Sequence, residues 1–303
     1  MNVKIIVPIY NPDGKFNMLI ESYKGQTIYN NTEMLIINSG DSSDFIRSLD
    51  SKHFSIINIS PDEFDHGKTR QLGVDCSIGA DIVVFLTQDA ILETKYSLEK
   101  LISTFRNPNI GAVYGRQIPH LCATSIAQHS RFFNYGKKSH VRTFDERREF
   151  GIKTTFLSNS FAAYKKEALI SVGGFPNNMI FGEDMFIGAK LLMAGWKIGY
   201  SAEARVYHSH NYSIMDELKR SFDIGVFHER ERWILNFFGK AEGEGIKFVK
   251  SEILFLCKND LKKVPECILR DIVKFLGYKL GVRYKWLPNF IRKKISLNKK
   301  FWN

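Results

Sequence analysis

Short apolar segments alternate with helical segments through the first third of the chain. The segment at 3–10, VKIIVPIY, is rich in β-branched residues and stops at Asn11-Pro12, which predicts a buried strand. The further elements expected here are strands at 33–40, 54–60, 81–90 and 110–117 and helices at 15–25, 68–77 and 94–107. Strands that alternate with helices over short connections predict an α/β fold with a mostly parallel, doubly wound sheet.

Polar residues follow several of these strands directly. They are Asn11, the turn at 38–41 and the pair Gln88–Asp89. Because ligands of open α/β sheets bind beyond the carboxyl ends of the strands, we expect the functional site there.

The net charge of +11 belongs to the C-terminal end of the chain. Residues 246–303 contain 15 Lys and Arg against 4 Asp and Glu, so the preceding part is neutral. The segments 246–257 and 264–280 place apolar residues at helical spacing beside lysines, which predicts amphipathic helices. A basic helical region suits an anionic membrane surface or nucleic acid, and a helical cap packed on the body is the alternative.

Several functional classes have no support in the sequence. The cysteines Cys76, Cys122, Cys257 and Cys267 lack metal-binding spacing, so we expect reduced thiols in a cytoplasmic protein. No signal peptide and no membrane span are expected, because no apolar run reaches about 18 residues. The chain also has no G-x-x-x-x-G-K-[ST], G-x-S-x-G or H-E-x-x-H motif.

Asp89 follows the most apolar of the predicted strands, in the segment FLTQDA. A carboxylate there can hold a divalent cation whose remaining ligands are phosphates, although such an Asp is also a common turn or helix cap. His208 and His210 alternate in VYHSHNYS, and at strand spacing they would point to opposite faces. We therefore expect at most one of them to join a metal site with Asp89.

Two further segments combine charge with a predicted helix start. In FDHGKTRQLG (64–73), Arg70 could bind a diphosphate, or the segment could simply be a solvent-facing helix start. In GEDMFIGAK, Glu183 and Asp184 open a helix at 184–194. A favourable interaction with the helix dipole explains one acid there. The functional alternative is that one acid acts as a general base and the other orients it.

Four segments in this order resemble the inverting glycosyltransferases of family 2, which have a GT-A fold: VPIYN, the NSGDSSD turn, TQD at a strand end, and GEDMFIGAKLLMAGWKIGY. The resemblance covers roughly residues 1–215. Further segments resemble bacterial rhamnosyltransferases that build O-antigen-like polysaccharides from dTDP-L-rhamnose: FDHGKTRQLG, FLTQDA, VYGRQIPH, FLSNSFAAYKKEAL, VYHSHNYS and FDIGVFH.

The resemblance implies a role for each matching position. Asp184 would be the general base and Glu183 its support, while Asp89, with His208 or His210, would hold Mg²⁺ or Mn²⁺. The nucleotide of the donor would lie against Pro8, Tyr10, Asn11, Asn38, Ser39, Asp41, His66, Arg70 and Gln88. Two positions depart from the family pattern. Thr87 replaces the first acid of D-x-D, which puts metal dependence in question, and Asn38 stands where many relatives have Asp.

The resemblance also implies partners and a location. The donor would be dTDP-L-rhamnose and the acceptor a lipid-linked oligosaccharide, at the cytoplasmic face of the cell membrane. We expect a catalytic domain at 1–215, with a nucleotide-sugar half at 1–117 and an acceptor half, irregular at 118–160, at 118–215. A basic helical region would follow at 216–303 and contact the anionic membrane, with no nucleic acid bound. The alternatives are a UDP-sugar glycosyltransferase, a nucleotidyltransferase, and a basic nucleic-acid-binding protein.

Overall fold

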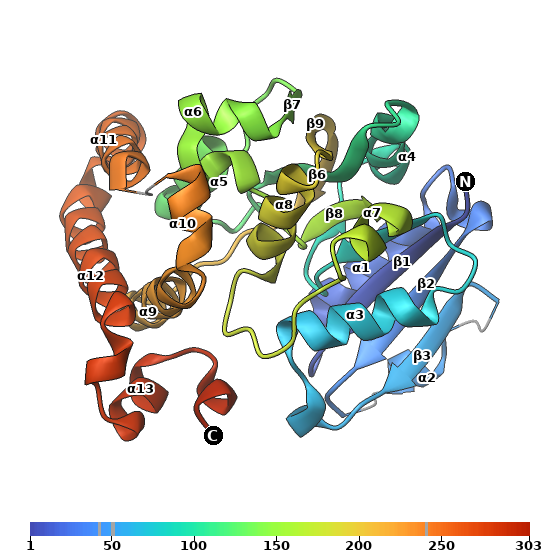
Figure 1. The fold of residues 1–303 in the computed structure, drawn as a ribbon, viewed down its shortest axis with the longest axis horizontal. Coiled ribbons are helices and arrows are strands. Elements are labelled where there is room, and N and C mark those ends of the chain that lie inside the picture. Colours follow the sequence, from blue (N-terminus) through green and yellow to red (C-terminus); the bar gives the residue numbers. More distant parts are fainter. Residues whose placement is uncertain (42–43, 50–51, 240–241) are drawn as a thin grey trace.

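The computed structural model describes residues 1–41, 44–49, 52–239 and 242–303. Within these residues a single nine-stranded sheet has the order β3-β2-β1-β4-β8-β6-β9-β5, and β7 pairs with β9 at the side (Figure 1). The strands are β1 (Val3–Ile9), β2 (Thr32–Asn38), β3 (Phe54–Asn58), β4 (Ile82–Leu86), β5 (Ile91–Leu92), β6 (Ile110–Ile118), β7 (His140–Arg142), β8 (Phe161–Lys165) and β9 (Lys197–Tyr207).

The first half of the sheet is parallel, as predicted, because β3, β2, β1 and β4 all run in one direction. The second half is mixed. β8 runs antiparallel to both β4 and β6, β6 and β9 are parallel, and β5 and β7 run antiparallel to β9. The expectation of a mostly parallel sheet is therefore confirmed for β1, β2, β3, β4, β6 and β9, which share one direction. β5, β7 and β8 run the other way, and their direction depends on connections that carry no local signal.

Helices cover both faces of the sheet. The α-helices are α1 (Gly14–Lys24), α2 (Asp44–Arg47), α3 (His66–Cys76), α4 (Ser97–Ser103), α5 (Ser125–Asn134), α6 (Arg147–Phe150), α7 (Lys166–Ser171), α8 (Glu183–Met193), α9 (Ile214–Arg230), α10 (Arg232–Phe238), α11 (Glu242–Asn259), α12 (Val264–Val282) and α13 (Asn289–Ile295). Two apolar cores result. Ile6 and Phe85 belong to one, and Ile5 and Val84 belong to the other, so successive strand residues are buried on opposite faces.

Side-chain caps explain where the helices nearest the strand ends begin. Asp13 accepts the backbone N–H of Lys15 before α1, and Asp65 accepts those of Gly67 and Lys68 before α3. Both helices therefore start beside the edge of the sheet where the polar residues lie.

The segment 118–160 is more ordered than expected, because it contains α5, β7 and α6. The buried face of α5 includes His129 beside Ile126 and Ala127. A histidine in a buried position interrupts the apolar periodicity, which is why the sequence did not predict this helix.

The C-terminal helices pack against the body of the molecule. Phe222 and Phe227 of α9 lie in the same apolar core as Ile187 and Leu191 of α8, and Trp302 near the C-terminus joins them. No helix in the described ranges is long and apolar enough to cross a membrane. Residues 216–303 thus form, at least in part, the packed cap weighed above.

Candidate active site

The ends of six strands meet at one edge of the sheet. β1, β2 and β4 are parallel and end there. The antiparallel strand β8 starts opposite the end of β4, with Phe161 paired to Leu86, and β6 and β9, which run antiparallel to β8, end at this same edge. The topology therefore brings together Asp89 after β4, Gln117 at the end of β6, Asn159 before β8 and His208 after β9.

Hydrogen bonds between the backbone of Tyr10 and the side chain of Gln88 join the loop after β1 to the loop after β4. The N–H of Tyr10 donates to Oε1 of Gln88 at 2.8 Å, and Nε2 of Gln88 donates to the carbonyl of Tyr10 at 3.3 Å. The Tyr10 ring itself is exposed, and Pro8 lies within β1 just before it. An exposed ring on a fixed backbone can stack on a flat ligand such as a nucleobase.

The turn after β2 lies against the loop after β1. Asn11, which has a φ of 42°, accepts the N–H of Asp41 at 3.1 Å. Asn38 is buried, and its side-chain amide donates a hydrogen bond to Oδ1 of Asn58 and accepts one from the N–H of Gly40. The hydroxyl of the buried Ser39 donates to the carbonyl of Ile9. Asn38 and Ser39 therefore shape this turn with their side chains. Ser42 and Ser43 of the NSGDSSD motif lie outside the described residues.

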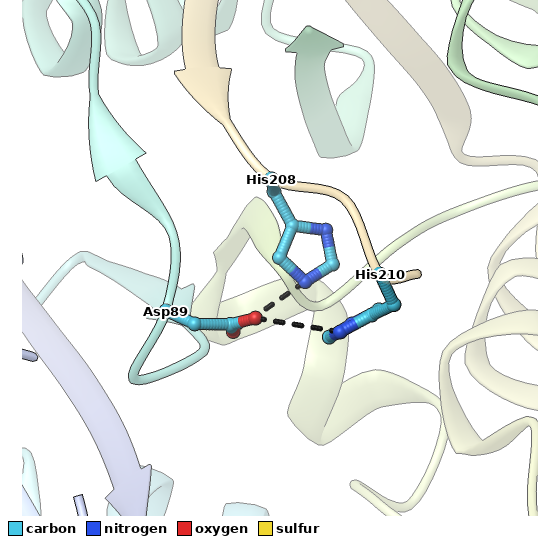
Figure 2. A group of neighbouring side chains, drawn as sticks. All are labelled: Asp89, His208 and His210. Atoms are coloured by element: carbon cyan, nitrogen blue, oxygen red, sulfur yellow. Dashed lines mark ion pairs between the residues drawn. The ribbon is translucent and has the colours of Figure 1, made fainter. Parts of the chain in front are cut away.

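Asp89 lies between two histidines (Figure 2). Its Oδ1 is 3.5 Å from Nε2 of His208, and its Oδ2 is 3.7 Å from Nδ1 of His210. Burial opposes ionisation of Asp89, but in acid the hydrogen bond and charge of protonated His208 and the charge of protonated His210 outweigh burial and lower the pKa of Asp89. Burial, followed by the charge of His208, lowers the pKa of His210 to about 3. Burial also lowers the pKa of His208, so both imidazoles are neutral near pH 7, as metal ligands must be.

The protonation of His208 is determined by a neighbour on the opposite side. Nδ1 of His208 lies 2.8 Å from Oε1 of Gln117, whose Nε2 donates to Ser158 at 2.8 Å and whose Oε1 also accepts from Arg131. Since Oε1 can only accept, Nδ1 carries the proton and Nε2 turns a lone pair toward Asp89. Two nitrogens and a carboxylate directed at one point fit a divalent cation, and the ligand atoms lie within 4.8 Å of one another.

The expectation that His208 and His210 point to opposite faces is wrong. β9 ends at Tyr207, so both residues lie in the loop beyond it, where strand alternation no longer applies. Their rings are 4.7 Å apart and both face Asp89.

Glu183 is a buried acid at the start of α8, held by groups from two other segments. Oε1 of Glu183 is 3.1 Å from the guanidinium of Arg70 and accepts a hydrogen bond from Nδ2 of Asn159 at 3.1 Å. Burial raises the pKa of Glu183, but the charge of Arg70 and then of His66 lower it further than burial raises it. Glu183 is therefore ionised, and Arg70, which also donates to the carbonyl of His66, is engaged by it.

Asp184 has a different environment although it is the next residue. It is partly exposed, and its Oδ2 accepts the N–H of Asn159 at 3.3 Å. Burial, and then the negative charge of Glu183, raise the pKa of Asp184 to about 7. Adjacent carboxyls with pKa values moved apart are typical of sites in which one acid orients and the other exchanges a proton.

Gly182 makes this placement possible. It precedes α8 with a φ of 77°, and a Cβ there would lie 2.9 Å from the ring of Phe227. A side chain at position 182 would be strained in the left-handed region and would also clash, so glycine is required where the chain turns into the Glu183–Asp184 pair.

Arg220 of α9 was not predicted as a site residue. Its guanidinium lies over the ring of Phe181 at 4.8 Å and over that of Tyr212 at 5.7 Å. Its charge contributes to lowering the pKa of His66, beside Glu183, and of His208 and His210, beside Asp89, so it acts on both groups. Within the described part of the chain no carboxylate lies within 4.0 Å of it.

Three other residues of the site also escaped prediction. Gln117, Arg131 and Asn159 orient the histidine and the acids. Gln117 and Asn159 lie in VYGRQIPH and FLSNSFAAYKKEAL, and their position beside strand ends was the available signal. Arg131 lies on α5, a helix that the sequence did not predict.

The chain has relatives over its whole length. A family model described as Glycosyl transferase family 2 matches residues 4–173. The O-antigen chain rhamnosyltransferase RfbN of Salmonella typhimurium is 44% identical, over 100% of this chain and 96% of the relative. The O-antigen chain rhamnosyltransferase WbaN of Salmonella anatum is 46% identical, over 99% of this chain and 95% of the relative.

Solved structures share the fold at low sequence identity. The mannosyltransferase PcManGT of Pyrobaculum calidifontis, in complex with GDP-Man and Mn²⁺, aligns with a TM-score of 0.63 at 14% identity, over 94% of this chain and 88% of the other. TarS 1–349 of S. aureus, in complex with UDP-GlcNAc, aligns with a TM-score of 0.53 at 13% identity, over 94% and 91%. These alignments confirm the expected GT-A type of α/β fold.

Proposed function

The chain belongs to glycosyl transferase family 2 and is a glycosyltransferase, and from that premise we propose that it transfers L-rhamnose from dTDP-L-rhamnose to a lipid-linked glycan in the synthesis of an O-antigen-like polysaccharide. The identity of 44–46% with two O-antigen chain rhamnosyltransferases over nearly their full lengths supports the sugar and the pathway. Membership of the family removes two alternatives, a nucleotidyltransferase and a nucleic-acid-binding protein.

The observation that carries the mechanism is the pair at the start of α8. Asp184 is partly exposed, has a pKa near 7, and lies beside an ionised Glu183. We assign Asp184 as the general base. It would accept the proton of the acceptor hydroxyl as that oxygen attacks the anomeric carbon, while the bond from that carbon to the dTDP oxygen breaks. One displacement of this kind inverts the anomeric configuration.

Glu183 would support this base without exchanging protons itself. Its charge is balanced by Arg70 and fixed by Asn159, so it stays ionised as Asp184 titrates. The fixed negative charge keeps the pKa of Asp184 close to working pH, where a base is most effective.

The nucleotide would bind where the loops after β1, β2 and β4 meet. Tyr10 offers an exposed ring, and Asn11, Asp41 and Gln88 hold the surrounding loops. Because Arg70 is engaged by Glu183, we assign the diphosphate to Arg220, whose guanidinium has aromatic neighbours and no close carboxylate in the described part of the chain. A planar guanidinium can hold phosphate oxygens through paired hydrogen bonds.

Asp89, His208 and His210 would hold Mg²⁺ or Mn²⁺. A divalent cation bound there supplies positive charge that neutralises the departing diphosphate. The two histidines compensate for Thr87, which stands where the first acid of D-x-D would be, by adding neutral nitrogen ligands beside a single carboxylate. Mg²⁺ prefers oxygen ligands, whereas imidazole nitrogen favours Mn²⁺. We therefore propose that this site binds Mn²⁺ more tightly than Mg²⁺.

A lipid-linked acceptor would place the enzyme at the cytoplasmic face of the cell membrane. The surplus of 11 positive charges in residues 246–303 supports attraction to anionic lipid there.

The experiment that tests this function measures donor choice. Calorimetric titration of the protein with dTDP and with UDP, each with and without Mn²⁺, should give tighter binding of dTDP that strengthens with the metal. A preference for UDP would keep the glycosyltransferase mechanism and replace the donor, whereas transfer of labelled rhamnose from dTDP-L-rhamnose to a membrane extract would establish the reaction directly.

A further inference from the structure

Helix α12 has its apolar side turned outward. Ile268, Leu269, Ile272, Phe275 and Leu276 form one stripe along it, and each is between 45 and 59% exposed. We call these five residues the docking face. Figure 1 shows α12 at the outer edge of the molecule. A contiguous apolar stripe on an exposed helix is unusual for a surface that faces water.

The opposite side of α12 is polar and faces the protein. Nζ of Lys274 lies 2.6 Å from Asp271 and 3.7 Å from the buried Glu252 of α11. The guanidinium of Arg270 lies 3.3 Å from Glu217 of α9. The helix therefore buries ion pairs and exposes hydrocarbon, the reverse of the pattern expected for a helix of a water-soluble protein.

Close packing prevents α12 from rotating to bury its apolar stripe. Gly277 and Gly281 lie against α9, where a Cβ at 281 would be 2.1 Å from the carbonyl oxygen of Phe222 and one at 277 would be 2.5 Å from that of Leu218. Any rotation would replace these glycines with larger side chains. The outward orientation of the docking face is therefore built into the packing.

Apolar side chains on neighbouring elements are also accessible. A groove of about 430 Å³ between α11 and α12 is lined by Val249 and Ile253 of α11 and by four residues of α12: Ile268, Asp271, Ile272 and Phe275. Trp286 and Phe290, which follow α12, are 86% and 72% exposed. Exposed Trp and Phe beside basic residues are typical of helices that lie in a membrane interface.

The segment that contains the docking face carries a surplus of positive charge, and its acids are already paired. Of the four acids in residues 246–303, Glu252 and Asp271 contact Lys274, Glu266 binds Arg270, and Asp260 accepts a hydrogen bond from Ser125. The exposed cations of the same segment include Lys258, Lys262, Arg283 and Lys294, whereas Nζ of Lys285 lies 3.8 Å from Glu229 of α9. Apolar side chains with a positive rim complement an anionic bilayer.

We propose that the docking face inserts into the surface of an anionic lipid bilayer, with α12 lying parallel to the membrane. This inference rests on the proposed function only for its purpose, which is to bring the enzyme to a lipid-linked acceptor. A second copy of this chain is the less suitable occupant, because two such faces would bring together two positively charged rims. A bilayer supplies both hydrocarbon and negative charge.

The test is sedimentation of the full-length protein with vesicles of phosphatidylcholine alone or with phosphatidylglycerol added. The wild type should bind the anionic vesicles, and the double variant Ile272→Glu/Phe275→Glu should lose at least about 10-fold in partitioning. The matched control is Ile78→Glu, which changes a residue that is 91% exposed on the catalytic body and should bind like the wild type. Lys258→Gln/Lys262→Gln should weaken binding in proportion to the anionic lipid content.

Three results would overturn the proposal. They are equal binding of the double variant and the wild type, absence of binding by a wild type that is folded by circular dichroism, and a wild-type dimer in sedimentation velocity that the double variant abolishes without any effect of lipid. Rhamnosyl transfer to a water-soluble acceptor analogue is measured in parallel and should be equal in both proteins. If the double variant loses vesicle binding but keeps transfer, the docking face is needed for membrane binding and not for the reaction. If the wild type binds vesicles but shows no rhamnosyl transfer, only the proposed function is wrong.

Discussion

Arg70 and Glu183 form a buried ion pair, 3.1 Å from nitrogen to oxygen, which joins the second turn of α3 to the first turn of α8. The two residues are 113 positions apart in the sequence, yet both side chains are less than one-tenth exposed. The pair connects the nucleotide half of the molecule to the segment that carries the assigned base.

Arg70→Gln should destabilise the fold, because it leaves the Glu183 carboxylate buried without a cation. We expect a loss of about 3–5 kcal/mol in the free energy of unfolding by urea. The double variant Arg70→Gln/Glu183→Gln should recover much of this loss. Lys24→Gln, which breaks an exposed ion pair with Glu21, is the control and should cost under about 1 kcal/mol. A single variant as stable as the wild type would mean that the pair is not buried in solution.

Activity should fall in acid because the base must be deprotonated. The pKa of Asp184 is raised to about 7, so its carboxylate fraction declines tenfold for each pH unit below that value. We predict that kcat/KM, measured at saturating metal, decreases with unit slope below about pH 7 and is flat just above it. A profile that stays flat down to pH 5 would contradict the assignment of Asp184.

Asp89→Asn should weaken metal binding, because it removes the only carboxylate of the cluster with His208 and His210 in the described chain. Removal of one ligand should reduce Mn²⁺ affinity at least about 10- to 100-fold. Electron paramagnetic resonance of free Mn²⁺ measures this without any need for turnover. Asp62→Asn, a change at an exposed acid, is the control. Equal Mn²⁺ binding by the Asp89 variant and the wild type would place the metal elsewhere.

Arg220→Gln should weaken dTDP binding if this guanidinium holds the diphosphate. Loss of a charge-assisted hydrogen bond predicts roughly a 10- to 100-fold increase in Kd by calorimetry. Arg230→Gln changes an arginine of the same helix that lies over Phe301, and it should bind dTDP like the wild type. Thymidine lacks the diphosphate, so it should bind Arg220→Gln and the wild type equally. The loss of dTDP affinity is then assigned to the contact between Arg220 and the phosphates.

Sequence and structure agree best where strands are buried on both faces. The segments 3–10, 33–40 and 81–90 correspond to β1, β2 and β4 within a few residues, because a continuous apolar run between turn residues strongly favours a buried strand. Asp89 could be singled out because it follows such a strand, and Glu183 and Asp184 because they open a predicted helix. The antiparallel insertion of β8 was not predictable, since it depends on the path of residues 118–160.

Other features depend on contacts between distant segments. His208 and His210 could not be placed on one side without knowledge that β9 ends at Tyr207. Arg220 lies on a helix outside the expected catalytic segment, and only the packing of α9 brings it to the site. The periodicity of α12 predicted an amphipathic helix correctly, but it did not reveal that the polar side faces inward, because buried ion pairs with α9 and α11 determine that choice.

The most direct test of the central claim compares Asp184→Asn with the wild type in two assays on the same protein samples. The substitution removes the base and preserves the size of the side chain. Calorimetric binding of dTDP should be unchanged, while rhamnosyl transfer should fall by about 10²- to 10⁴-fold, the contribution of a general base. Transfer at the wild-type rate by a variant that binds dTDP normally would contradict the account.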